Sequence, residues 1–180
     1  ALVAALNERA AELPASAKVG DARDFELGSE FDVVLAPMQL LQLFNGPEQR
    51  IACLRGVAAH LVPGGLAAFA IVEEMPTPVD APPPLPDTRE IDGWVYSSLP
   101  INARVESGSI QVRRLRQTVS PQGELTEELH EVGLRVLAAA TLEGEAGEAG
   151  EAGLLPVGRR AIPPTEAHVG STVVLLEKAA

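Results

Sequence analysis

The sequence predicts an α/β fold built on a mainly parallel sheet whose last strand runs antiparallel. The first observation is a strand-helix-strand unit between Phe31 and Val72. Two continuous apolar runs, residues 31–36 and 66–72, flank a helical segment from Pro47 to Leu61. Parallel strands need such a crossover, and their burial on both faces produces continuous apolar runs instead of alternation. The unit therefore predicts two neighbouring parallel strands in the middle of the chain.

The second observation concerns the end of the chain. Residues 134–142 and 171–177 are both apolar enough for strands, and no helix is expected between them. A parallel partner would require a crossover helix, so the last strand is predicted to run antiparallel to its neighbour.

Composition sets broad limits on this fold. The chain has 180 residues, 46% of them hydrophobic and only 3% aromatic, so we expect one folded domain with a core of Leu, Val and Ala. The net charge of -11 makes nucleic acid an unfavourable main partner. No apolar run is long enough to span a membrane, and a cytoplasmic location is expected. The single Cys53 excludes an internal disulfide and a multi-cysteine zinc site, no metal is expected, and the oligomeric state stays open.

The N-terminal segment predicts a helix followed by a short strand. Leu2, Leu6 and Leu13 share one helix face, and Pro14 ends the helix. No N-cap residue precedes this helix, so we expect the chain to lack the N-terminal part of its domain. A short strand is predicted at Val19.

The central helix carries the clearest helical pattern. Ile51, Leu54 and Leu61 lie on one face, and Pro47 suits the first turn. The Pro-Gly-Gly sequence at residues 63–65 is predicted to end the helix and turn the chain.

An insertion is predicted after the second central strand. Residues 75–87 are rich in proline and predict an extended connection. Short strands are predicted at residues 94–96, 103–105 and 110–116, with a hairpin turn at residues 107–109. We therefore expect one domain over residues 1–180, with a Pro-rich and β-hairpin insertion at residues 75–120.

The segment after the insertion predicts mixed structure. Residues 124–132 predict a short helix that Gly133 ends, and residues 134–142 predict a strand. The Gly-Glu-Ala repeat at residues 144–153 predicts a flexible acidic loop, and residues 171–177 predict the final strand.

Three sequence words, in order and at fitting spacings, resemble the class I S-adenosylmethionine-dependent methyltransferases. Residues 19–24 (Val-Gly-Asp-Ala-Arg-Asp) resemble the end of that family's third strand, residues 31–36 resemble its fourth strand, and residues 61–65 (Leu-Val-Pro-Gly-Gly) resemble the turn before its fifth. The resemblance implies a Rossmann-like, mainly parallel sheet with an antiparallel last strand. The family's first two strands, its glycine-rich cofactor loop and the acid that binds the ribose would lie before Ala1. The fold is therefore expected to lack those two strands and half of the cofactor site.

The resemblance also implies a set of cofactor-binding residues. Asp21 would accept a hydrogen bond from the adenine amine, and the backbone N–H of Ala22 would meet a ring nitrogen. Leu2 would pack on the adenine. Ala36, Pro37 and Met38 would line the methionine part of the cofactor and the substrate entrance, at the strand ends where open α/β sheets bind ligands. The alternatives are that Asp21 caps the following turn, and that Leu2 and Met38 belong to the core.

The implied activity is transfer of a methyl group from S-adenosylmethionine to a small-molecule acceptor. Such a displacement depends mainly on alignment and exclusion of water, and no catalytic residue is assigned. Glu73 and Glu74 are the acids predicted nearest the substrate. The alternatives are a nicotinamide-dependent oxidoreductase, whose glycine fingerprint could also lie before Ala1, and a non-enzymatic binding module with the same fold.

Overall fold

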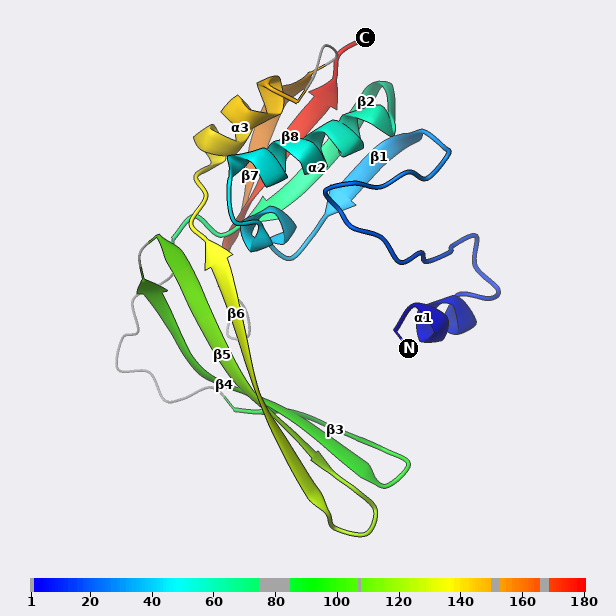
Figure 1. Ribbon diagram of the computed structural model, residues 1–180, viewed down its shortest axis with the longest axis vertical. Coiled ribbons are helices and arrows are strands. Elements are labelled where there is room, and N and C mark those ends of the chain that lie inside the picture. The colour runs from blue at the N-terminus through cyan, green and yellow to red at the C-terminus, as the bar shows by residue number, and fades with distance from the viewer. Residues whose placement is uncertain (1, 75–84, 107, 150–152, 166–168) are drawn as a thin grey trace.

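The computed structural model describes residues 2–74, 85–106, 108–149, 153–165 and 169–180 (Figure 1). Its elements, in chain order, are α1 (Leu2–Arg9), β1 (Phe31–Ala36), the 3-10 helix η1 (Leu40–Leu43), α2 (Pro47–Ala59), β2 (Leu61–Ile71), β3 (Asp87–Ile91), β4 (Trp94–Glu106), β5 (Ser109–Val119), β6 (Leu125–Arg135), α3 (Ala139–Gly147), β7 (Leu154–Ile162) and β8 (Ser171–Lys178). None of the described helices is long and apolar enough to cross a bilayer.

The first sheet has four strands in the order β1-β2-β8-β7. β1 and β2 are parallel, as the strand-helix-strand pattern predicts, and α2 forms the crossover between them. β8 runs antiparallel to both β2 and β7. The predicted direction of the last strand is therefore confirmed, together with the Rossmann-like fold class.

The core lies between this sheet and the two helices α2 and α3, which cover the same face (Figure 1). Leucine supplies much of it: Leu54, Leu61, Leu142 and Leu176 are all fully buried, together with Phe69. This agrees with a composition that is poor in aromatic residues. Burial of each such side chain contributes about 1.5–3 kcal/mol.

The opposite face of the first sheet carries apolar side chains that stay exposed. Val33 and Leu35 of β1 and Leu66 of β2 point away from the helices, and Val33 pairs in register with Leu66. Successive side chains of a strand point to opposite faces, so the buried Ala36 and Ala67 belong to the face covered by the helices.

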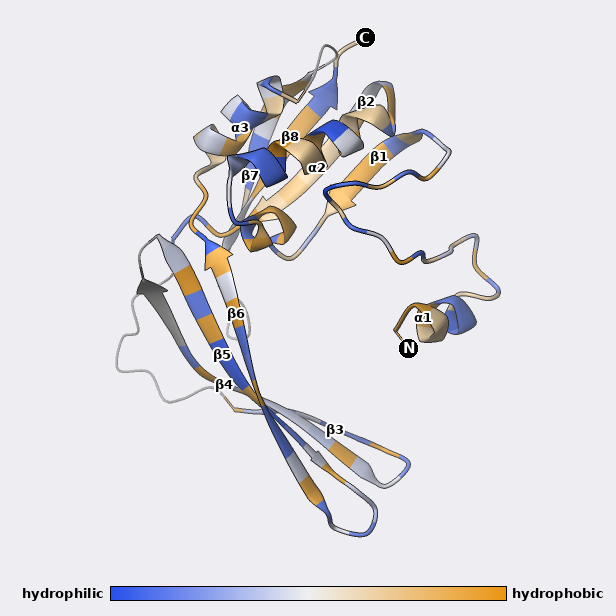
Figure 2. Cartoon of the chain, in the orientation of Figure 1, coloured by the Kyte–Doolittle hydropathy of each residue, from blue (hydrophilic) through white to orange (hydrophobic). Residues whose placement is uncertain are grey.

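The second sheet is an antiparallel meander, β3-β4-β5-β6, that projects away from the first (Figure 1). Asp92 and Gly93 join β3 to β4 with φ angles of 51° and 77°, the left-handed pair that a two-residue hairpin turn requires. β4 and β5 run antiparallel, and Glu106 and Ser109 form their last pair before the turn, so the predicted hairpin is confirmed. Figure 2 shows hydrophobic and hydrophilic residues alternating along β5, as expected of a half-buried strand.

Two polar side chains, the buried Gln42 and the partly buried Glu73, hold the region around the end of β2. The fully buried Gln42 accepts a hydrogen bond from Val72 N (2.7 Å) and donates to the carbonyl oxygens of Val72 (2.9 Å) and Arg135 (2.8 Å). The Glu73 carboxylate accepts from Ala139 N (2.8 Å), at the start of α3, and from Thr172 Oγ1 (2.7 Å). Together they connect the ends of β2 and β6 to α3 and β8.

The segment after residue 120 differs from the sequence-based predictions. Residues 124–132 are not a helix but most of β6, which pairs with β5 over its whole length, with Gly133 inside the strand. Cross-strand contacts such as Gln117 Nε2 to Glu127 Oε1 (2.6 Å) override the weak helical pattern.

The predicted strand at residues 134–142 and the predicted loop at 144–153 are also wrong within the described residues, because α3 covers 139–147. Its buried face, Ala139, Leu142 and Ala146, has helical spacing.

β7 was not predicted because Pro156 and Gly158 interrupt its pattern. The structure tolerates both at an edge strand with a register shift between them. The last strand therefore pairs with β2 and β7, and not with residues 134–142.

Two predictions about neighbouring segments need adjustment. The predicted strand at Val19 does not form: residues 15–20 are irregular, and only an isolated bridge joins Asp21 to Asp24. β2 begins at Leu61, so the Pro-Gly-Gly sequence lies inside the strand, near a register shift.

Residues 75–84 of the Pro-rich connection lie outside the described residues. The assignment of residues 1–180 to one domain with an insertion at 75–120 stays a prediction, and the second sheet extends to Arg135.

The ion pair between Arg50 of α2 and Glu145 of α3 supplies a stability prediction. Arg50 Nε and Nη2 lie 2.7 and 2.5 Å from the two carboxylate oxygens, and both side chains are about 90% buried, with exposures of 10% and 9%. We expect Arg50→Met or Glu145→Met to lower the free energy of unfolding by about 3 kcal/mol, because each leaves a buried charge unpaired. The double variant should lose clearly less than the sum of the two single losses, measured by urea unfolding. Additive losses would contradict the pairing.

Candidate functional site

A cavity of about 430 Å³ lies at the carboxyl end of β1. Its lining comes from three parts of the chain: residues 18–22 and 24–27 of the N-terminal segment, Val34–Ala36 and Phe69 of the first sheet, and Leu40, Cys53 and Val57 of η1 and α2. The parallel register places Ala36 beside Phe69 at this end of the sheet. The N-terminal segment therefore forms a wall over the ends of the two parallel strands.

The floor of the cavity is apolar and buried. Ala36, Cys53, Val57 and Phe69 are all below 9% exposed. Burial raises the pKa of the Cys53 thiol to about 11, with a smaller contribution from the negative charge of Asp21. The thiol is therefore protonated and acts as a small apolar group, as the sequence predicts.

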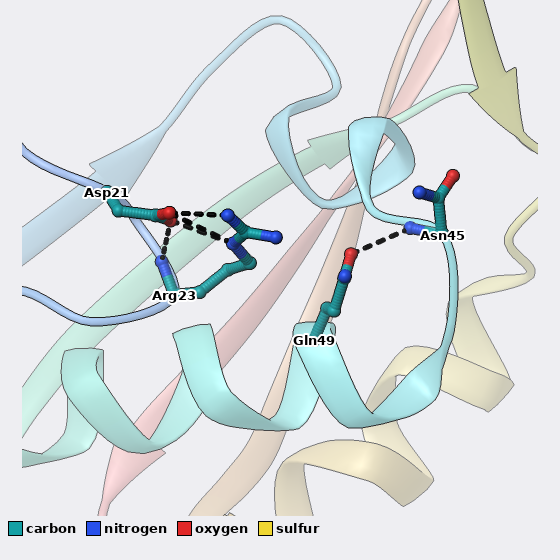
Figure 3. Close-up of polar contacts among 4 residues, drawn as sticks. All are labelled: Asp21, Arg23, Asn45 and Gln49. Carbon is teal, nitrogen blue, oxygen red and sulfur yellow. Dashed lines mark hydrogen bonds and ion pairs between the residues drawn. The ribbon is translucent and has the colours of Figure 1, made fainter.

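The rim of the cavity carries a carboxylate held by a neighbouring guanidinium (Figure 3). Asp21 Oδ1 accepts hydrogen bonds from Arg23 N (2.9 Å) and Arg23 Nε (2.9 Å), and Oδ2 accepts one from Arg23 Nη2 (2.5 Å). The side-chain hydrogen bonds of Arg23, followed by its backbone N–H, lower the pKa of Asp21 to about 2. Asp21 is thus ionised at neutral pH.

One wall, residues 25–27, is held by His60 at the end of α2. Leu27 N donates to His60 Nε2 (2.9 Å), and the ring stacks on Phe25 with a centroid distance of 4.8 Å. Because Nε2 accepts from Leu27, the ring proton lies on Nδ1, which donates to Gly56 O (2.8 Å). The hydrogen bond from Gly28 N lowers the pKa of Glu26.

The structure brings together part of the predicted cofactor set. Asp21, Ala22 and Ala36 line the cavity. The turn-capping alternative for Asp21 also holds, since its carboxylate accepts the N–H of Arg23 two residues later.

Three predicted residues lie outside this group. Leu2 is 88% exposed on α1, which lies apart from both sheets (Figure 1). Pro37 and Met38 follow β1 but do not line the cavity, and Met38 is 81% exposed with a φ of 58°. Their roles in binding stay predictions.

Other lining residues were missed by sequence reasoning. Phe69 could have been found from the parallel pairing with Ala36, and Cys53 from its helical spacing with Val57. No sequence signal predicts that Phe25 and His60 stack. Both carboxylate oxygens of Glu73 accept hydrogen bonds, one from Ala139 N and one from Thr172 Oγ1. The N–H of Ala139 is the main cause that lowers the pKa of Glu73, and the side chain stabilises the start of α3. The described residues contain no cluster of acidic, histidine or cysteine side chains that could hold a metal ion.

The single cysteine offers a direct check of the cavity floor. At pH 8 the folded chain should react with a thiol reagent roughly 100-fold or more slowly than the urea-unfolded chain, because a pKa raised by two units reduces the thiolate by that factor. The reagent's absorbance gives the rate. Equal rates in the two states would show that Cys53 is not buried.

Comparisons with known proteins agree with this architecture. No protein-family model matches the chain. A segment of 48 residues is 48% identical to the cypemycin N-terminal methyltransferase of a Streptomyces species, covering 27% of this chain and 20% of that relative. The matched part thus spans about a fifth of the curated relative.

Solved structures match nearly the whole chain. DesVI of Streptomyces venezuelae gives a TM-score of 0.65 with 21% identity, covering 97% of this chain and 70% of its own. The sugar N-methyltransferase KedS8 of Streptoalloteichus gives 0.69 with 16% identity, covering 98% and 67%. CalS10, an amino pentose methyltransferase from Micromonospora echinaspora solved with S-adenosylmethionine, gives 0.63 with 17% identity, covering 98% and 70%. The chain therefore has the fold of the class I S-adenosylmethionine-dependent methyltransferases.

Proposed function

We propose that the chain is part of an enzyme that transfers a methyl group from S-adenosylmethionine to a small-molecule acceptor. The observation that carries this proposal is the cavity at the end of β1, where Asp21, Ala22 and Ala36 lie together. Open α/β sheets bind ligands outside the carboxyl ends of their strands, which is the position of this cavity. The antiparallel β7–β8 hairpin supports this function over a nicotinamide-dependent oxidoreductase.

The lining fits the adenosine end of the cofactor. The buried apolar floor suits the faces of a planar base, and few polar groups interrupt it. Asp21 is ionised and therefore only an acceptor, which suits the donor N–H of the adenine amine. Asp21 would hold the amine, with the backbone of Ala22 and the side chain of Ala36 beside the base.

The reaction depends mainly on the alignment of the methyl donor with the acceptor. S-adenosylmethionine supplies a methyl group on a positively charged sulfur, and the acceptor displaces that sulfur in line. The residues of this chain would hold the adenosine end and keep water from the base, which fixes the donor relative to the acceptor. No catalytic acid or base is assigned.

An amine nitrogen is the acceptor atom that we favour. The structural neighbours include enzymes named as a sugar N-methyltransferase and a glycopeptide N-methyltransferase, and the curated relative is named for an N-terminal methyl transfer. In such a transfer a neutral amine would attack the methyl carbon as the carbon–sulfur bond breaks, S-adenosylhomocysteine would leave, and the new ammonium would release a proton to water.

Calorimetric titration with S-adenosylhomocysteine tests the proposed cofactor site. We expect saturable binding, and Asp21→Asn should weaken it about tenfold, because a charged hydrogen bond to the amine is lost. Asp87→Asn, which makes the same change on the second sheet, should bind as the unaltered chain does. Equal losses in both variants would contradict the assignment of Asp21, and no binding at millimolar ligand would contradict the proposed function.

A further inference from the structure

Arg23 does not line the cavity, but it donates hydrogen bonds to Asp21, which does. It lies two residues after Asp21, in a tight turn closed by Asp24 N donating to Asp21 O (3.0 Å). Asp21 lines the cavity, and Arg23 does not. Its guanidinium and its own N–H both bind the Asp21 carboxylate (Figure 3).

The acceptor positions of Asp21 can be counted. An ionised carboxylate has roughly four acceptor positions, two on each oxygen. Oδ1 accepts from Arg23 N and from Arg23 Nε, both at 2.9 Å, so its positions are filled. Oδ2 accepts from Arg23 Nη2 at 2.5 Å and, through an N–H that Nε shares with Oδ1, from Nε at 3.2 Å. The contact at 3.2 Å is the longest of the four, so it is the acceptor position that a single outside donor can take over.

We propose that Arg23 is a positioning residue that makes the cavity selective for purines carrying an exocyclic amine. The bidentate contact fixes the plane of the Asp21 carboxylate and leaves one acceptor position for one N–H of a ligand. A ligand with a carbonyl oxygen at that place would meet the carboxylate oxygen and be repelled. This inference rests on the proposed function, because it assumes that the cavity holds the adenosine end of the cofactor.

The electrostatic state of the pair agrees with this role. The contact with Arg23 lowers the pKa of Asp21 to about 2, so the carboxylate stays an acceptor even in mildly acidic solution. The pair is half exposed, with side-chain exposures of 44% for Arg23 and 47% for Asp21. Exposed ion pairs contribute little to folding, so an altered Arg23 should leave the chain folded.

Nuclear magnetic resonance titration with two neutral nucleosides separates this role from a structural one. Adenosine has the exocyclic amine, and purine riboside is the same nucleoside without it. We expect the unaltered chain to bind adenosine about tenfold more tightly than purine riboside, the value of one charged hydrogen bond. In Arg23→Gln this ratio should fall to about two, while the dissociation constant for purine riboside stays the same.

Two further variants sharpen the test. Arg23→Lys keeps the charge but loses the planar fork, so it should restore only part of the ratio. Arg159→Gln breaks a comparable exposed pair, Arg159 Nε and Nη2 to Glu143 at 2.7 and 2.6 Å, and should keep the full ratio. Melting temperatures of all variants, measured in parallel, establish that they are folded.

Each outcome decides between the two proposals. A tenfold ratio that persists in Arg23→Gln, or adenosine binding that strengthens there, would overturn the role of Arg23 and leave the proposed function standing. A ratio near one in the unaltered chain would overturn the contact between Asp21 and the amine, and with it the role of Arg23. No binding of either nucleoside would overturn the cavity as the adenosine site, on which the proposed function also rests.

Discussion

The structure depends on the packing of one face of the β1-β2-β8-β7 sheet against α2 and α3. Leu54, Leu142 and Leu176 meet Phe69 in this layer, and nearly all fully buried side chains belong to it. Because α2 is also the crossover that makes β1 and β2 parallel, the same packing brings their carboxyl ends together. The cavity exists at those ends, since its floor is the edge of this core.

The second sheet is joined to this layer through the buried side chain of Gln42. Gln42 hydrogen-bonds the backbone at the end of β2 and at the end of β6, and Glu73 holds the start of α3. A buried amide with three hydrogen bonds is expensive to leave unpaired, so these contacts favour one relative placement of the sheets. The antiparallel sheet is thereby held near the carboxyl ends of β1 and β2 (Figure 1).

Local patterns predicted the centre of the fold, and non-local contacts decided the rest. The segments 31–36 and 47–61 follow from continuous apolar runs, a proline at the first turn and helical spacing, all of which are visible in the sequence. A helix is predicted where β6 forms, and a strand and a loop are predicted where α3 forms. The structure differs because pairing with β5 and burial in the core outweigh short-range propensity. In the site, the sequence segments that resemble the methyltransferase family indicated Asp21, Ala22 and Ala36. The stacking of Phe25 on His60 depends on the path of the N-terminal segment, which no local pattern encodes.

Methyl transfer by this chain requires that the cavity beside Asp21 receives the adenosine end of the methyl donor. A crystal structure of the chain with S-adenosylhomocysteine tests it most directly. We expect adenine between Ala36 and Phe25, with its exocyclic amine within hydrogen-bond distance of Asp21 Oδ2. Adenine bound elsewhere, for example on the antiparallel sheet, or bound in the cavity with its amine directed away from Asp21, would contradict it.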